Sequence, residues 1–116
     1  MNELEQGLIT IATEHFRFSH VFQQAMEELP IEQQSKYSSR FSWFSKRVLS
    51  ALETAGFGLV DLTGQDYDPG MAVTPLNLDD FQPEDQLVIA QMLEPVIMRD
   101  TTIVKTGTVI LERSNV

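Results

Sequence analysis

The sequence predicts an α+β protein in which an N-terminal antiparallel helical hairpin precedes a small β-rich domain. Within residues 4–29, and again within residues 37–55, apolar side chains recur at alternating spacings of three and four. This is the rhythm of helices that pack against other helices. After Gly56, glycine and proline recur too often for long helices, and short runs rich in β-branched residues lie between them. We therefore expect a helical dimerisation region over residues 1–56 and a β-domain over residues 57–116.

The first helix is expected over residues 3–28. Its heptad stripe consists of Leu4, Leu8, Ile11, His15, Phe18, Phe22, Ala25 and Leu29. Further apolar residues such as Phe16 and Val21 widen the stripe, so this helix should be covered on more than one side. Pro30 lacks an amide donor and disfavours helical geometry at the residue before it. A break between two helices is therefore expected there.

The second helix is expected over residues 32–55, and Gly56 stands where a left-handed C-cap is needed. Its stripe consists of Tyr37, Phe41, Phe44, Val48, Ala51 and Ala55, opposite a face of serines. Two helices with broad apolar faces cannot cover each other completely, so two hairpins should form a four-helix bundle in a homodimer. The residues expected in that bundle are Phe18, Phe22, Phe41, Trp43, Phe44 and Val48. A role for the aromatic patch around Trp43 as a partner-binding hot spot is the alternative.

The C-terminal half is expected to form short strands. The runs with β character are residues 58–62, 71–75, 87–93, 96–98 and 103–111. Residues 101–104 and 108–111 are rich in β-branched side chains, which predicts a strand at each. Between the first two, Asp68-Pro69-Gly70 predicts a turn in which proline presets the second position and glycine takes a positive φ at the third. Residues 86–93 are open between strand and helix, because Pro83 and two acidic residues could also begin a helix.

The net charge of −9 is concentrated in the β-domain. Residues 1–56 carry seven acidic and five basic side chains, whereas residues 57–116 carry ten acidic and three basic ones. Phosphate backbones would repel such a domain, so no nucleic-acid partner is expected; the charge favours a basic protein surface or serves solubility alone. No apolar run approaches the roughly 18 residues that span a bilayer. The acidic N-terminus and the absence of cysteine favour a cytoplasmic protein with no membrane partner.

Candidate catalytic and metal-binding residues are few, so we expect no enzymatic activity, metal or cofactor. The two histidines, His15 and His20, lie on different sides of one helix, and His15 falls on the heptad stripe, where burial could make assembly sensitive to mildly acidic pH. Asp61, Asp66 and Asp68 lack the spacing of a calcium loop. Gly56 and Gly58 form a lone G-x-G with no third glycine, which is not a dinucleotide fingerprint.

The junction between the two halves resembles that of the GrpE family of nucleotide-exchange factors. The residues that carry the resemblance are Leu52-Glu53-Thr54-Ala55-Gly56-Phe57, Val60, Gly64, Tyr67-Asp68-Pro69, Ala72-Val73 and Lys105-Thr106-Gly107-Thr108-Val109-Ile110-Leu111. The resemblance implies a homodimer whose β-domains insert against the ATPase domain of a DnaK-type chaperone and open its nucleotide cleft. It also implies that partner contacts fall on Met98, Arg99, Lys105 and Val109, and it favours a strand at residues 86–93.

Two departures from the family pattern leave an alternative open. Gly70-Met71 replaces the histidine that usually follows the Asp-Pro step, and only about 50 residues precede the β-like part, where the family has a long coiled coil. The chain is therefore expected to be either a shortened exchange factor for a DnaK-like or actin-like ATPase, or a structural or adaptor subunit of a larger complex. A small hydrolase is a third and more remote alternative.

Overall fold

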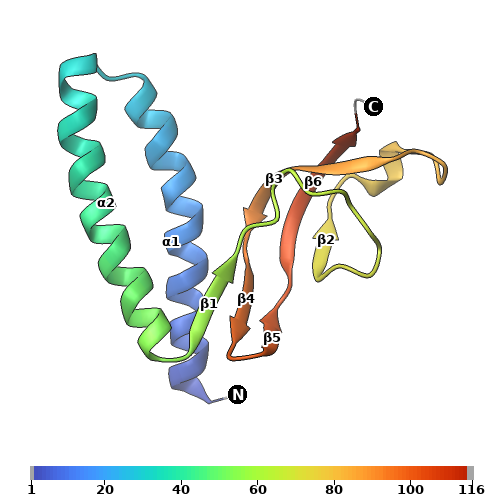
Figure 1. Ribbon diagram of the computed structural model, residues 1–116, viewed down its shortest axis with the longest axis horizontal. Helices are drawn as coiled ribbons and strands as arrows, with labels where there is room; N and C mark the ends of the chain where they lie inside the picture. Colours follow the sequence, from blue (N-terminus) through green and yellow to red (C-terminus); the bar gives the residue numbers. More distant parts are fainter. Residues whose placement is uncertain (1, 115–116) are drawn as a thin grey trace. The chain divides into compact units, whose positions relative to one another are not determined.

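The computed structural model describes residues 2–114, and the chain divides into two compact units, Met1–Gly58 and Leu59–Val116. The first unit contains two long helices, and nearly all of the β-structure belongs to the second (Figure 1). The predicted fold class, α+β with an N-terminal helical hairpin, is confirmed.

Helix α1 spans Glu3–Glu27 and helix α2 spans Ile31–Thr54, and the two run antiparallel beside each other (Figure 1). The side-chain oxygen of Asn2 accepts a hydrogen bond from the Glu5 amide at 2.8 Å, which satisfies one of the amides that a helix start leaves unpaired. As predicted, Pro30 separates the helices. Gly56 follows α2 with a φ of +89°, the left-handed conformation that suits glycine after a helix end.

The seam between α1 and α2 is largely aromatic. Phe22 and Phe41 stack with their ring centroids 4.7 Å apart, and His15 stacks on Phe41 at 6.1 Å. Ala12 on α1 and Leu52 on α2 are also buried. His15 and Phe22 lie seven positions apart on α1, and Phe41 and Leu52 lie eleven apart on α2, so each pair falls on one face of its helix.

Within residues 2–114, six strands form two three-stranded sheets, with the orders β1-β4-β5 and β2-β6-β3. The strands are β1 Phe57–Val60, β2 Val73–Pro75, β3 Leu87–Glu94, β4 Val96–Arg99, β5 Thr102–Lys105 and β6 Gly107–Arg113. In the second sheet β6 is central, antiparallel to β3 and parallel to β2. A single turn of 3-10 helix, η1, covers Leu78–Asp80 between β2 and β3.

The core of the second unit is formed by alternate residues of its strands. Val109 and Leu111 on β6 are buried, and each faces a buried partner on β3, with Val109 opposite Met92 and Leu111 opposite Ile89. Ile97 on β4 is also fully buried. The strand period of two places these side chains on one face.

The run at residues 103–111 forms two strands, which coincide with the two segments rich in β-branched residues, 101–104 and 108–111. The run breaks at Thr106, so that β5 belongs to one sheet and β6 to the other. Gly107, the first residue of β6, has no room for a side chain: a Cβ there would lie 2.7 Å from the Met92 methyl group and 3.0 Å from the carbonyl oxygen of Glu94. The chain crosses between sheets where only glycine allows this close approach.

The turn at residues 68–70 forms, but by a different mechanism from the one predicted. Gly70 does not have a positive φ, and the left-handed residues are Gly56, Gly64 and Asp100. Instead, the Asp68 carboxylate accepts a hydrogen bond from the Gly70 amide at 3.0 Å, and the Asp68 carbonyl accepts one from the Met71 amide at 2.9 Å. The aspartate side chain therefore organises the turn. Residues 87–94 form a strand, the outcome that the family resemblance favoured.

Candidate interaction surfaces

Each heptad stripe consists of two columns of residues, with a spacing of seven within each column, and the hairpin leaves one of the two columns exposed. Phe18 on α1 is 55% exposed and Phe44 on α2 is 50% exposed. The columns that close the seam are the neighbouring ones, which contain His15, Phe22 and Phe41. Ring contacts link Phe18 to Phe22 at 6.1 Å, Phe22 to Phe41 at 4.7 Å, and Phe41 to Phe44 at 6.3 Å. Phe18 and Phe44 therefore border the seam from the same side.

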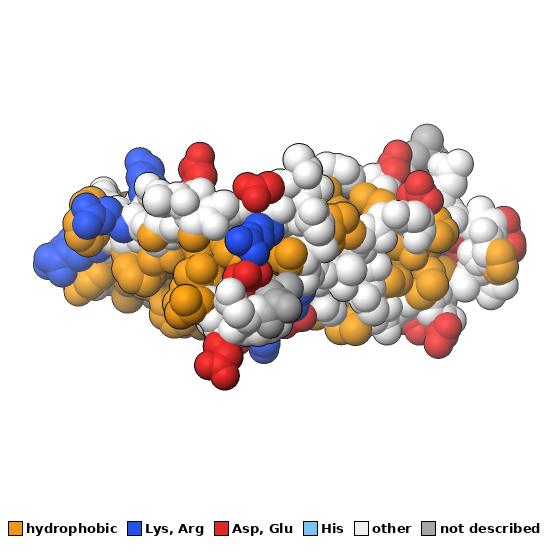
Figure 2. Space-filling model, turned by 90° about the horizontal axis from the view of Figure 1, so that it is seen from below, with side chains coloured by type: hydrophobic (Ala, Val, Ile, Leu, Met, Phe, Trp, Pro, Cys, Tyr) orange, Lys and Arg blue, Asp and Glu red, His pale blue; other side chains and the backbone are white. Residues whose placement is uncertain are grey.

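We call this side the apolar face. It consists of Leu4, Ile11, Phe18, Tyr37 and Phe44, all of them exposed. In the space-filling view of Figure 2, hydrophobic side chains gather over the hairpin. A contiguous apolar surface of this kind usually marks an interaction site, whereas single exposed apolar residues do not.

The six residues expected in a dimer bundle fall into two groups. Phe22, Phe41 and Val48 are half-buried within the hairpin itself, whereas Phe18, Trp43 and Phe44 are exposed. Trp43 precedes Phe44 by one residue, so its side chain projects about 100° away around α2. The guanidinium of Arg47 lies 5.3 Å from the centroid of its ring, a cation–π contact on the outer side of the helix.

Charged residues border the apolar face differently on the two helices. On α2, Arg40 and Arg47 lie three residues after Tyr37 and Phe44, respectively. On α1, the bordering residue is Glu14, which lies three residues after Ile11 and whose carboxylate is 3.9 Å from Arg17. The edge of the apolar face on α2 is therefore basic, whereas its edge on α1 carries the carboxylate of Glu14.

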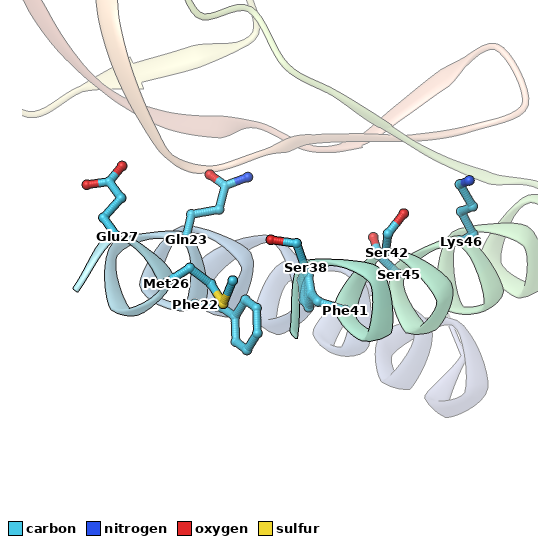
Figure 3. Close-up of a pocket in the computed structure, with 9 residues that line it drawn as sticks. All are labelled: Phe22, Gln23, Met26, Glu27, Ser38, Phe41, Ser42, Ser45 and Lys46. Carbon is cyan, nitrogen blue, oxygen red and sulfur yellow. The ribbon is translucent and has the colours of Figure 1, made fainter. Parts of the chain in front are cut away.

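A cavity of about 600 Å³ opens on the opposite, serine-bearing side of the hairpin (Figure 3). The side chains of Gln23, Ser42 and Lys46 extend to one side of the helices, whereas the ring of Phe22 extends to the other. The residues that line it are Phe22, Gln23, Met26, Glu27, Ser38, Phe41, Ser42, Ser45 and Lys46.

Ser45, which lines this cavity, is hydrogen-bonded to His15, with its hydroxyl oxygen 3.1 Å from Nε2. A nucleophilic serine needs such a base, but the base must in turn be oriented by a third group. The other ring nitrogen, Nδ1, is buried without a partner, and the ring stacks against Phe41 and lies 6.2 Å from Phe44. The pair is therefore part of the packing of the seam.

Burial lowers the pKa of His15 below its usual value of 6.5, so we expect the hairpin to lose stability in mild acid. Above pH 6.5 the imidazole is neutral in both the folded and the unfolded chain. As the pH falls through that value the unfolded chain takes up the proton first, which lowers the free energy of unfolding. Urea unfolding followed by Trp43 fluorescence at pH 7.5 and at pH 5.5 measures this loss.

His15→Leu should reduce the loss of stability between these two pH values, and His20→Gln should preserve it, because His20 bonds only to the Phe16 carbonyl of its own helix and contacts the Phe16 ring. An equal loss in the unaltered chain and in His15→Leu would show that other groups cause the pH dependence.

Three of the four residues predicted to bind a partner lie together on the hairpin of β4 and β5. Met98 and Arg99 are on β4, and Lys105 on β5 is paired in register with Ile97. The ammonium group of Lys105 forms an ion pair with Glu94 at 3.3 Å, and both side chains are about one-quarter exposed. Ile103, which the sequence did not single out, is 49% exposed on the same hairpin.

The prediction for Val109 is wrong. Its side chain is fully buried in the core between β6 and β3, so it offers no surface to a partner. The residues of β6 that alternate with it, such as Thr108, are only partly buried.

Within the described residues, no helix is long and apolar enough to cross a membrane, and no group of three or more His, Cys, Asp or Glu side chains could hold a metal ion. Comparison of the chain with protein-family models, with curated proteins and with solved structures finds no match.

Proposed function

We propose that this protein is a non-enzymatic homodimer that binds an ATPase of the DnaK or actin type and modulates its nucleotide exchange. The observation that carries the proposal is the apolar face: a helical hairpin that leaves half of each heptad stripe exposed needs a further helical layer. The GrpE-like sequence pattern that begins at the end of α2 supports the exchange role.

A second copy of the chain is the occupant that we propose for the apolar face. Two hairpins that meet through this face would complete a four-helix bundle, the symmetric solution for a self-complementary surface. Phe18 and Phe44 lie at its centre, next to the stacked rings of the seam. Both would then be shielded from water, and the aromatic area so buried would dominate the association.

The charges at the borders favour one of the two symmetric arrangements. If α1 lies against the partner's α2, Glu14 approaches the partner's Arg47, because His15 and Ser45 already show that these parts of the helices lie at one level. If instead α2 lies against the partner's α2, the two helices run antiparallel and Arg40 faces the partner's Arg47. Exposed pairs contribute little affinity, but they discriminate between registers. We therefore place α1 against the partner's α2.

Cross-linking through introduced cysteines tests this arrangement, because the natural chain has none. Glu14→Cys and Arg47→Cys are prepared as separate proteins, mixed to exchange subunits, and treated with a short bismaleimide. We expect a cross-linked product that joins the two variants. Ser42→Cys on the serine side is the matched control and should give little product with either. More efficient linkage between Arg40→Cys and Arg47→Cys would contradict the arrangement.

The exchange role follows from differential binding. If the second unit binds the open state of an ATPase cleft more tightly than the closed state, it shifts the population of the ATPase toward the open state. Nucleotide is then released. The hairpin of β4 and β5, which carries Met98, Arg99, Lys105 and the exposed Ile103, is the contact element that we propose for this binding.

Release of a fluorescent ADP analogue from a DnaK-type ATPase of the same organism tests the exchange role. We expect the unaltered protein to accelerate release at least about tenfold, since even a coupling of about 1.4 kcal/mol changes an equilibrium by that factor. Arg99→Glu should remove most of the acceleration, whereas Lys46→Glu, a matched charge reversal on the hairpin, should leave it. No acceleration with any DnaK-type or actin-like ATPase of that organism would eliminate the exchange role.

The second candidate is an adaptor or structural subunit that keeps the fold without opening a cleft. It is favoured by the ion pair between Lys105 and Glu94 and by the burial of Val109, because two of the four expected partner contacts are then engaged within the unit itself. A stable dimer that binds a protein other than an ATPase, and leaves nucleotide release unchanged, would support this candidate.

A further inference from the structure

The second unit contains a cavity of about 580 Å³ that no part of the proposed exchange role uses. It lies between the turn at residues 66–69 and the segment 78–87. Its lining residues are Asp66, Tyr67, Pro69, Leu78, Gln82, Pro83, Asp85, Gln86 and Leu87. We call it the β-unit pocket. Its volume is within the range of about 300–1,000 Å³ that is usual for binding pockets.

One wall of the pocket is fixed to the outer edge of β3. The Gly64 amide donates to the Ile89 carbonyl at 2.8 Å, the Ile89 amide to the Gln65 carbonyl at 2.9 Å, and the Tyr67 amide to the Leu87 carbonyl at 2.9 Å. These bonds hold residues 64–67 against the strand, so Tyr67 keeps its place without a ligand.

The other wall is fixed at its end by Asp85. Its carboxylate accepts a hydrogen bond from the Gln82 amide at 2.9 Å and forms an ion pair with Arg113 at 3.4 Å. The Arg113 guanidinium also lies 5.4 Å from the centroid of the Phe81 ring. Both walls are therefore preformed, which reduces the entropy lost when a ligand binds.

The chemistry of the pocket combines an apolar lining with negative charge. Tyr67, Leu78 and Leu87, with two prolines, provide the apolar surface. Residues 61–85, from which most of the lining comes, contain seven acidic side chains and no Lys or Arg. Because Arg113 pairs with Asp85, the negative charge of the lining is centred on Asp66. An excess of acidic side chains around a concave apolar surface attracts cationic ligands and repels anionic ones.

We propose that the β-unit pocket binds a short cationic segment of a partner protein, with one large apolar side chain inserted beside Leu78 and Tyr67, and with Lys or Arg residues placed near Asp66. A buried anchor side chain inside a charged rim is the usual energetic pattern of a peptide site. The pocket lies apart in sequence from Met98, Arg99 and Lys105, so the proposal does not depend on nucleotide exchange.

Selection from a random heptapeptide library displayed on phage, with the full chain as bait, tests the proposal. We expect enriched peptides to carry a large aliphatic or aromatic residue beside at least two Lys or Arg residues. For the best synthetic peptide, Leu78→Ser should weaken binding at least about tenfold and Asp66→Asn about threefold. Asp100→Asn, which removes the same charge from the turn between β4 and β5, should leave the affinity unchanged.

Leu78 is 43% exposed and Asp66 is exposed, so neither substitution disturbs the core. Asp66→Lys is a further variant that keeps the test decisive if Leu78→Ser fails to fold, and it should abolish binding. The proposal is overturned if no peptide is enriched, if the enriched peptides lack either the basic or the apolar residues, or if the pocket variants bind as tightly as the unaltered chain.

Discussion

The double variant Phe18→Glu/Phe44→Glu is expected to be a monomer at concentrations at which the unaltered chain is a dimer. In the proposed bundle each copy contributes both rings to the interface, so the variant would bury four carboxylates without basic partners. Burying an unpaired charge costs several kcal/mol. We expect the dimer dissociation constant to rise at least a hundredfold, which corresponds to about 2.8 kcal/mol. Sedimentation equilibrium over a range of concentrations measures it.

The hairpin itself should survive this change. Both rings are about half exposed, and the stack of Phe22 on Phe41 and the bond between His15 and Ser45 do not involve them. Far-UV circular dichroism should therefore show an unchanged helix content in the variant.

Ser38→Glu/Ser42→Glu is the matched control, because it adds the same two charges to the serine side of the hairpin. This control should remain a dimer. Dissociation of both double variants would point to a general effect of charge, and persistence of the dimer in Phe18→Glu/Phe44→Glu would eliminate the apolar face as the interface.

The helix bounds could be predicted closely because their signals are local. Pro30 and Gly56 act through their own backbone conformations, and α1 and α2 end within one residue of the expected positions. The heptad stripe, however, consists of two adjacent columns, and the spacing does not say which column closes the hairpin. That choice depends on contacts across the seam, such as Phe22 with Phe41, between residues far apart in the sequence.

The strands of the second unit were predicted less well than the helices, because a run of β-forming residues does not show which alternate side chains face the core. The run Thr108-Val109-Ile110-Leu111 has β-forming residues at every position, so it gives no indication of which alternate residues face inward, and a shift of one residue exchanges core for surface. The family resemblance assigned Val109 to a partner surface, and the phase of this run gave no indication against that assignment. The two strands on either side of Thr106 could be predicted from their β-branched residues, but the close approach at Gly107 could not, since the crowding comes from Met92 and Glu94 on β3.

The β-unit pocket had no sequence signal that could have identified it. Asp66 and Asp85 read as loop charges, and Leu78 lies in a 3-10 turn that was not expected. The three come together only because residues 64–67 add to the edge of β3 while the segment after β2 returns to β6. Sites built from long connections between strands depend on tertiary pairing, which local propensity does not encode.

Asn77 is the residue that ties this returning segment to the core, and its replacement should have the largest effect on the stability of the second unit. Its side chain donates to the Leu111 carbonyl at 2.8 Å and accepts from the Leu111 amide at 2.9 Å. It thereby extends the pairing of β6, in which the Leu76 amide already donates to the Val109 carbonyl at 3.0 Å. Leu111 is buried, so water does not readily replace these bonds.

Asn77→Ala would leave both backbone groups of Leu111 unpaired, at a cost of about 2–6 kcal/mol, since each buried unsatisfied group costs about 1–3 kcal/mol. Native-state hydrogen exchange at the β6 amides measures the loss, because it reports the opening of this unit separately from the helices. Gln82→Ala removes an exposed amide from the same segment and should cost little. Equal exchange rates in the two variants would show that the Asn77 bonds do not stabilise β6.

The variant Asn77→Asp distinguishes between the two hydrogen bonds to Leu111, because it keeps the acceptor of the side chain and removes the donor. A carboxylate still accepts from the Leu111 amide, but its second oxygen faces the Leu111 carbonyl and repels it. The variant should therefore be destabilised at neutral pH and recover part of its stability when the carboxyl is protonated, because the protonated group again offers a donor. Since Leu78 follows directly and lines the β-unit pocket, peptide binding should weaken in parallel with the loss of protection at Leu111. Loss of the Asn77 bonds would then weaken both the core of the second unit and the binding of peptide to the β-unit pocket.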